Sequence, residues 1–278
     1  SGTTSPRSTS RRAIRPKTSV ISSIVRLSTC RRPSASGRGS CSPGTAALLD
    51  EAAASGADLI GGLDPVGIDG DLAGHLDSVF AIAARHGKGI DIHLHDGGEV
   101  GLAQIDAIAE RTVAGGLSGK VAVSHAFALG SVPLDTAKRT ADRLARASVA
   151  IMSHGPGAAT MPPLLMLRDH GVRVFAGSDN IRDAWSPFGN GDMLERAMLI
   201  GYRGNYRRDE ELAFTLDLVT TNAAKVLGLE DYGLRVGGPA DLVVVEADTV
   251  AEAVATRPGR KMVIKAGRVV ARDGALVS

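Results

Sequence analysis

The sequence of 278 residues has few aromatic residues, few cysteines and no long apolar runs, and each shortage excludes a class of protein. Phe, Trp and Tyr make up only 3% of the chain, which argues against a nucleic-acid binder that stacks on bases. Two cysteines cannot build a disulfide scaffold, and they favour a reducing compartment such as the cytoplasm. No run of apolar residues is long enough for a membrane span, so no membrane partner is expected.

Acidic residues are absent from the first 49 positions, although that stretch holds nine of the 32 Lys and Arg residues. The rest of the chain is acidic overall, with 23 basic residues against 30 acidic ones. Residues 1–43 also carry twelve Ser and five Thr, and only Ser19–Leu27 has the β-branched content of a strand. Such a composition buries too little apolar surface to offset the entropy of ordering, so we expect residues 1–43 to be disordered or aberrant.

Three interpretations of this basic segment compete. An Arg- and Ser-rich segment without acids is typical of an organelle transit peptide, and a basic tail can also bind nucleic acid. The interpretation we favour is that residues 1–42 are read out of frame, because a frame error in a GC-rich gene enriches Arg, Ser, Pro and Gly. The underlying nucleotide sequence would decide between them.

From Gly44 onward, short apolar runs alternate with amphipathic stretches. The expected strands are Ala57–Leu63, Gly89–His93, Lys120–Ser124, Val149–Met152 and Val172–Ala176, and the expected helices are Thr45–Ser55, Leu72–His86, Val100–Ala114, Leu134–Ala147 and Pro163–His170. This alternation predicts parallel strands covered by helices, in a doubly wound sheet or a (β/α) barrel. No GxGxxG turn or P-loop supports a nucleotide-binding sheet, so the barrel is favoured. Ala240–Glu246 and Met262–Ala271 are expected strands of a small β module.

Polar residues repeatedly follow the expected strands, at the end where a barrel gathers its active-site groups. Four of the seven histidines, His93, His95, His125 and His154, lie there, and Asp179 follows the next strand. Imidazole and carboxylate groups are good ligands for zinc or iron, so the sequence predicts a metal-dependent hydrolytic site. The remaining histidines, His75, His86 and His170, lie on amphipathic helices, where a solvated surface role is expected.

Four segments together resemble the amidohydrolase superfamily, in particular its cytosine deaminase branch. They are Ile90–Glu99, Val121–Ala126, Val174–Leu194 and Asp231–Ala247, in the order that the family has. The resemblance implies an α/β fold: the C-terminal half of a (β/α)8 TIM barrel, followed by part of a small β-sandwich. On this basis we expect residues 44–235 to form the partial barrel and residues 236–278 to supply the β-sandwich strands.

The resemblance also implies roles for residues at the strand ends. His93 matches a metal-binding histidine, and Asp179 matches an aspartate that binds metal and accepts a proton from water. His125 matches the histidine that orients the attacking hydroxide. Asp96 stands at the position of the catalytic glutamate that shuttles protons.

Three further positions concern the substrate. Asn180 and Trp185 match substrate-pocket positions, and His154 replaces an Asn-Pro pair and is expected to contact substrate.

Asp96 is one methylene shorter than the glutamate, and its alternative role is to cap the following helix. His95 is an additional imidazole at a strand end and could bind a partner of Asp96. Asn180 replaces an acid that cytosine deaminases carry, so cytosine itself is not the favoured substrate.

The expected protein is a hydrolase that uses a divalent metal, Zn or Fe, to cleave a C–N bond of a small heterocycle through a metal-bound hydroxide. An N-alkylamino-triazine-type aminohydrolase is a second interpretation, and a non-catalytic fragment or pseudoenzyme is the rival from another class. No His-x-His motif precedes His93, so two of the family's metal ligands are missing and this chain is expected to be inactive. The metal, the substrate and the oligomeric state stay open, with a homo-oligomer among the options.

Overall fold

A computed structural model describes residues 24–27 and 44–277, and their centre is a six-stranded parallel sheet. Its strands are β1 (Ile24–Leu27), β2 (Leu59–Leu63), β3 (Gly89–Leu94), β4 (Val121–His125), β5 (Ala150–Ser153) and β6 (Val174–Ala176). The strands follow one another across the sheet in chain order, and every neighbouring pair is parallel. A doubly wound sheet reverses its order at a switch point, so this topology argues against that alternative.

The expected α/β fold with a parallel sheet is therefore confirmed. Within the described residues β1 and β6 do not pair with each other, so closure into a TIM barrel stays a prediction. Ile24–Leu27 pairs with β2 and belongs to the strand expected at Ser19–Leu27. The rest of residues 1–43, and with it the interpretation of that segment, lies outside the described residues.

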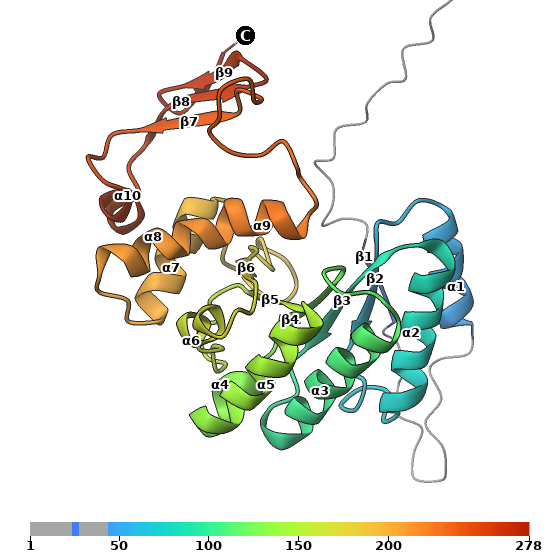
Figure 1. The fold of residues 1–278 in the computed structure, drawn as a ribbon. Helices are drawn as coiled ribbons and strands as arrows, with labels where there is room; N and C mark the ends of the chain where they lie inside the picture. Colours follow the sequence, from blue (N-terminus) through green and yellow to red (C-terminus); the bar gives the residue numbers. More distant parts are fainter. Residues whose placement is uncertain (1–23, 28–43, 278) are drawn as a thin grey trace, which may run out of the picture.

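Helices connect the strands and cover one face of the sheet (Figure 1). They are α1 (Thr45–Ala54), α2 (Leu72–His86), α3 (Gly98–Ala114), α4 (Ala128–Ser131), α5 (Leu134–Ala147) and α6 (Leu164–Asp169). In α5 the buried residues Ala137, Ala141 and Leu144 recur every three or four positions, which is the pattern of a helix with one apolar face. The helices and strands expected between residues 44 and 176 begin and end within two residues of the observed ones, and the short α4 was not expected.

Side chains alternate between the two faces of the parallel sheet. Ile90, Ile92 and Leu94 of β3 are buried in the hydrophobic core on the helix-covered face. Asp91 and His93, which lie between them in the strand, line a cavity on the opposite face. Because strand side chains alternate with period two, β3 presents Asp91 and His93 to this cavity, and β4 presents Ala122 and Ser124.

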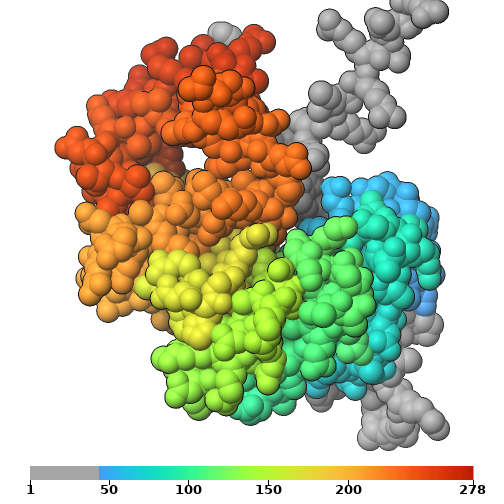
Figure 2. All heavy atoms as spheres, in the orientation of Figure 1, coloured from blue at the N-terminus to red at the C-terminus, as the bar shows by residue number. Residues whose placement is uncertain are grey.

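The chain after β6 first forms helices and then a second sheet. These elements are α7 (Met193–Arg203), α8 (Asp209–Val219), α9 (Thr221–Val226), β7 (Leu242–Val245), α10 (Val250–Thr256), β8 (Arg260–Lys265), β9 (Arg268–Arg272) and β10 (Ala275–Leu276). The second sheet is antiparallel, in the order β10-β9-β8-β7, and forms a lobe beside α7–α9 (Figure 2). No helix in residues 44–277 is both long and apolar enough to span a bilayer.

Sequence reasoning predicted β7 and the β8–β9 hairpin but missed α7 to α10. The sequence of α7 has the periodicity of a helix, because its buried residues Ile200 and Gly201 lie three and four positions after the buried Ala197. Asp192 caps this helix by accepting hydrogen bonds from the backbone N–H groups of Leu194 and Glu195.

The expectation of a solvated His75 is wrong. His75 is fully buried, and its Nδ1 lies 2.6 Å from Oδ2 of the buried Asp69. Its other nitrogen, Nε2, has no hydrogen-bond partner among the described residues and faces Gly62 of β2. Helix α2 packs closely on β2 here because Gly62 has no side chain, and this contact decides the burial of His75.

We expect Gly62→Ala to destabilise the protein by about 1–3 kcal/mol, the usual cost of overpacking a core. A Cβ at Gly62 would lie 2.3 Å from Nε2 of His75, in a place where a buried ring has little room to move. Urea unfolding of both proteins measures the change. Gly157→Ala is the control, because an added Cβ there meets no atom within 4 Å; equal unfolding midpoints for the two variants would contradict the prediction.

Candidate active site

Ionisable side chains converge where β3, β4, β5 and β6 end. They are His93, His95, His125, His154 and Asp179. His125 lies at the centre, with its Nε2 3.0 Å from Nδ1 of His93 and 3.8 Å from Oδ1 of Asp179. Nδ1 of His154 lies 3.8 Å from the other oxygen of Asp179. The structure thus brings together the two predicted metal ligands, the predicted orienting histidine and the predicted substrate-contacting histidine.

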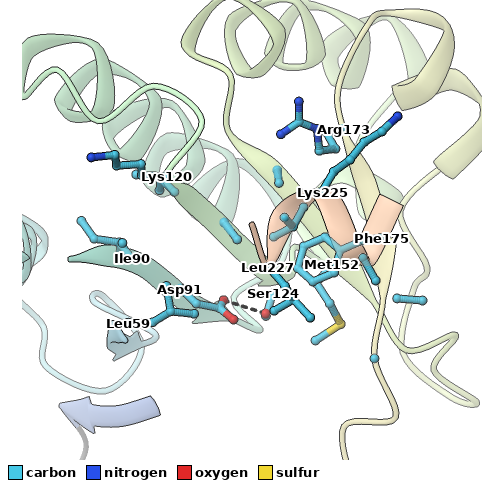
Figure 3. Close-up of a pocket in the computed structure, with 18 of the residues that line it drawn as sticks. Leu59, Ile90, Asp91, Lys120, Ser124, Met152, Arg173, Phe175, Lys225 and Leu227 are labelled. Atoms are coloured by element: carbon cyan, nitrogen blue, oxygen red, sulfur yellow. Dashed lines mark hydrogen bonds between the residues drawn. The ribbon is translucent and has the colours of Figure 1, made fainter. Parts of the chain in front are cut away.

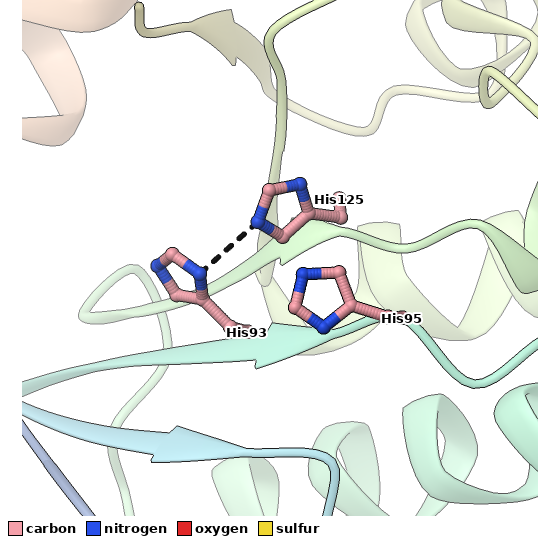
Figure 4. Close-up of side chains that lie close together, drawn as sticks. All are labelled: His93, His95 and His125. Carbon is pink, nitrogen blue, oxygen red and sulfur yellow. Dashed lines mark hydrogen bonds between the residues drawn. The ribbon is translucent and has the colours of Figure 1, made fainter. Parts of the chain in front are cut away.

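The parallel register explains this convergence. His93 pairs with Ser124 and Leu94 pairs with His125, so β3 and β4 end at the same level of the sheet. Figure 4 shows the rings of His93 and His125 turned toward each other, with His95 beside them.

Three strand-end residues have left-handed backbone conformations, although none of them is glycine. The φ angles are 42° at Asp64, 72° at His125 and 60° at Asp179. Such a conformation costs about 1–3 kcal/mol per residue and persists only where the surrounding structure holds it. The fold therefore tolerates a loss of stability at these three positions, and this backbone conformation orients their side chains.

Asp64, at the end of β2, binds His95. Oδ2 of Asp64 lies 2.8 Å from Nδ1 of His95, and Oδ1 accepts hydrogen bonds from the backbone N–H of His95 at 2.5 Å and of Asp96 at 3.3 Å. Burial by itself would raise the pKa of Asp64, but the hydrogen bonds and charge of His95 hold that pKa below its usual value. Sequence reasoning missed Asp64, although it directly follows an expected strand, as the noticed residues do.

Asp96 is held by a different set of groups. Its Oδ2 accepts hydrogen bonds from the backbone N–H of Gly67 at 2.9 Å and from Nε2 of the buried Gln104 at 2.8 Å. Oε1 of Gln104 in turn accepts from the backbone N–H of Val66. Asp96 does not cap α3, because Gly97 is at the cap position of that helix. The structure places its carboxylate against the β2–α2 loop, outside the group of imidazoles.

Arg196 of α7 ties two strand ends together. Its guanidinium donates to the backbone carbonyl of His154 at 2.6 Å and to that of Ser178 at 3.1 Å. Burial lowers the pKa of Arg196, while the charges of Asp179 and Glu195 raise it. The pKa of His154 is also lowered, chiefly by burial and further by Arg196, against the opposing charge of Asp179. His154 is therefore neutral at pH 7.

The loop after Asp179 holds the other predicted substrate residues. Nδ2 of Asn180 donates to Asp183 at 2.7 Å, and Asp183 also accepts from the backbone N–H groups of Trp185 and Ser186. These hydrogen bonds, with that of Asn180 the largest contribution, lower the pKa of Asp183. The side chain of Trp185 points to solvent and is 84% exposed. The structure brings neither Asn180 nor Trp185 into contact with the imidazoles.

A cavity of about 400 Å³ opens beside the group of imidazoles on the other face of the sheet, where residues of α9 also line it. His93 and Asp179 line its edge, and Leu59, Met152, Phe175 and Leu227 contribute apolar walls (Figure 3). Inside it, Oγ of Ser124 donates to Oδ1 of Asp91 at 2.7 Å. The lining also includes the charged residues Lys120, Arg173 and Lys225 (Figure 3), and a cavity of this size suits a small ligand.

The sequence profile described as "Amidohydrolase family" matches residues 11–271. The chain is similar to N-isopropylammelide isopropyl amidohydrolase of Pseudomonas sp. (strain ADP), with 32% identity over 232 residues, which are 83% of this chain and 58% of that protein. The chain spans about half the length of the curated relatives it matches.

Two crystal structures are similar to this chain. N-isopropylammelide isopropylaminohydrolase from Burkholderia multivorans has a TM-score of 0.82 and 48% identity, over 84% of this chain and 60% of that chain. 5-Methylcytosine deaminase from Klebsiella pneumoniae, liganded with 5-fluorocytosine, has a TM-score of 0.75 and 25% identity, over 83% and 59%.

We expect Asp64→Asn to lower the free energy of unfolding by about 1–3 kcal/mol at pH 6, because it weakens a buried, charge-assisted hydrogen bond. The folded-state pKa of Asp64 is lowered, so its ionised form contributes stability above the unfolded-state pKa. That contribution is lost as the pH falls below about 4 and passes through the folded-state pKa.

Chemical denaturation of wild type and variant at pH 6 and at successively lower pH measures this difference. Glu110→Gln is the control, because Glu110 is an exposed residue of α3. A gap between wild type and Asp64→Asn that stays constant down to pH 2 would contradict the assignment.

Proposed function

The chain belongs to the amidohydrolase family, and from that premise we propose that its strand-end site hydrolyses a C–N bond of a small heterocycle. The observation that carries the proposal is the convergence of four imidazoles and Asp179, of which His93 and Asp179 line a cavity of about 400 Å³. Removal of an alkylamino group from a triazine ring is the favoured form of the reaction. Its support is the 48% identity to an N-isopropylammelide isopropylaminohydrolase over 84% of this chain.

Deamination of a cytosine-like ring is the second candidate. The 5-methylcytosine deaminase covers the same part of the chain, but its identity is only 25%. Asn180 also stands where cytosine deaminases carry an acid, and its amide is hydrogen-bonded to Asp183 within its own loop. A ring that needs a carboxylate at this position is therefore less suitable.

The strand-end residues fit a divalent metal such as zinc or iron. Their donors are imidazole nitrogens and a carboxylate, which both metals accept, and Nδ1 of His154 is buried without a hydrogen-bond partner in the described part of the chain. His93 and Asp179 are the residues proposed to hold the metal. When bound, the metal supplies Lewis acidity that makes water nucleophilic near neutral pH.

His125 is proposed to orient the attacking water. Its Nε2 lies between Nδ1 of His93 and Oδ1 of Asp179, and its strained backbone fixes the direction of the ring. Phe127 packs against the ring, with the two centroids 5.4 Å apart, and limits its rotation. Asp179 is the nearest carboxylate and is proposed to accept the proton that water gives up.

His95 is proposed to pass that proton to the leaving nitrogen. Because the carboxylate of Asp64 only accepts, it selects the tautomer of His95 with the proton on Nδ1, and Nε2 is then the basic atom. The side chain of His95 is 41% exposed, so it can exchange protons at the mouth of the site. The proton-shuttling role expected for Asp96 stays a prediction; its carboxylate accepts hydrogen bonds from Gly67 and Gln104 and is proposed to hold the β2–α2 loop in place.

The test is amine release by the purified chain loaded with Zn²⁺ or Fe²⁺, with N-alkylamino-triazines and cytosine as alternative substrates. We expect alkylamine release to exceed ammonia release, and His95→Gln to lower kcat by about 10²–10⁴-fold, which is typical for loss of a general acid–base group. His170→Gln is the matched control, because His170 binds Asp142 on the helical side of the sheet.

The metal content of the same sample separates the alternatives. Bound metal without turnover would contradict hydrolysis by this chain and support the expectation, drawn from the missing His-x-His motif, that it is inactive. A chain that holds no metal and releases no amine would contradict the proposal and favour the non-catalytic fragment.

A further inference from the structure

His154 occupies a place in the site that the resemblance does not explain. The family pattern has no histidine there, yet β5 directs this side chain toward Asp179. Its Nδ1 is buried, and no hydrogen-bond partner for it exists in residues 24–27 and 44–277. Burial of a polar atom without a partner is costly, so such an atom indicates a ligand.

We propose that His154 is a metal ligand of this chain and shares with Asp179 the cation that His93 is also proposed to hold, while His125 keeps its role in orienting the water. The inference rests on the proposed function, because it concerns the metal of the same site. Two of the family's metal ligands are missing from this chain, and His154 supplies an additional one.

The distances suit a shared cation. Zinc lies about 2.0–2.2 Å from nitrogen and oxygen ligands, so two ligands of one ion are at most about 4.3 Å apart. Nδ1 of His154 is 3.8 Å from Oδ2 of Asp179, which is too long for a hydrogen bond and within this limit. His125 lies beside this pair, and ligand atoms of the three residues all lie within 4.8 Å of one another.

Hydrogen bonds from Arg196 fix the backbone at His154 and near Asp179. Arg196 donates to the carbonyls of His154 and Ser178, so one side chain from α7 sets both ligand-bearing segments. The positive charge of Arg196 opposes a bound cation, and the carboxylate of Asp179 offsets that repulsion.

The test measures binding of Zn²⁺ by titration calorimetry and of Co²⁺ by its visible absorption, on the full chain. Loss of an outer-shell partner already weakens metal binding 10- to 100-fold, so His154→Ala should weaken it by more than about 100-fold. It should also change the Co²⁺ spectrum. His170→Ala, the matched control, should bind both ions like wild type.

A second variant removes the ambiguity of a misfolded protein. His154→Cys keeps a zinc-binding side chain, so it should retain affinity and add a thiolate-to-cobalt charge-transfer band that wild type lacks. Wild-type affinity in His154→Ala, or no such band in His154→Cys, would overturn the inference.

The outcomes also separate this inference from the proposed function. Metal binding that depends on His154 in a chain without amine release would keep the ligand and reject the activity. Amine release with metal binding indifferent to His154 would keep the activity and reject the ligand. A chain that binds neither ion would overturn both.

Discussion

The parallel register of β3 to β6 is the constraint on which the candidate site depends. Neighbouring parallel strands end at the same edge of a sheet, so residues that each follow a strand in the sequence meet in space. His93 and His125 are 32 residues apart in the chain, yet their ring nitrogens are 3.0 Å apart. The same register places His154 and Asp179 within 3.8 Å of each other. A shift of β3 by one residue would turn His93 to the helix-covered face and remove it from the site.

The backbone of the site is strained, and contacts in the surrounding structure offset part of this strain. Asp64, His125 and Asp179 adopt left-handed backbone conformations that ordinary residues avoid. The hydrogen bonds of Asp64 to His95 and to the following backbone offset part of this strain. Functional positions commonly carry such strain, because the geometry that serves chemistry differs from the geometry that serves stability.

Helix α7 links the site to the C-terminal lobe. Arg196 of α7 holds the carbonyls at the ends of β5 and β6, and the neighbouring Glu195 lies 3.6 Å from Arg257. Asp192, which caps α7, also binds Arg260 of β8. The antiparallel sheet therefore supports the helix that aligns the strand ends, although it contributes no residue to the group of imidazoles. The candidate site consequently depends on both sheets.

The sequence by itself determined the βα alternation, the strand ends and the histidines that follow them, because these depend on local periodicity. It therefore identified His93, His125, His154 and Asp179 before any contact was known. Only the tertiary structure decided which side chains pair: Asp64 with His95, Gln104 with Asp96, and Asp69 with the buried His75. Those pairs depend on how closely helices and loops pack on the sheet, as the contact of His75 with Gly62 shows. Packing distances of this kind produce no periodic pattern in a single sequence, so only the tertiary structure determines them.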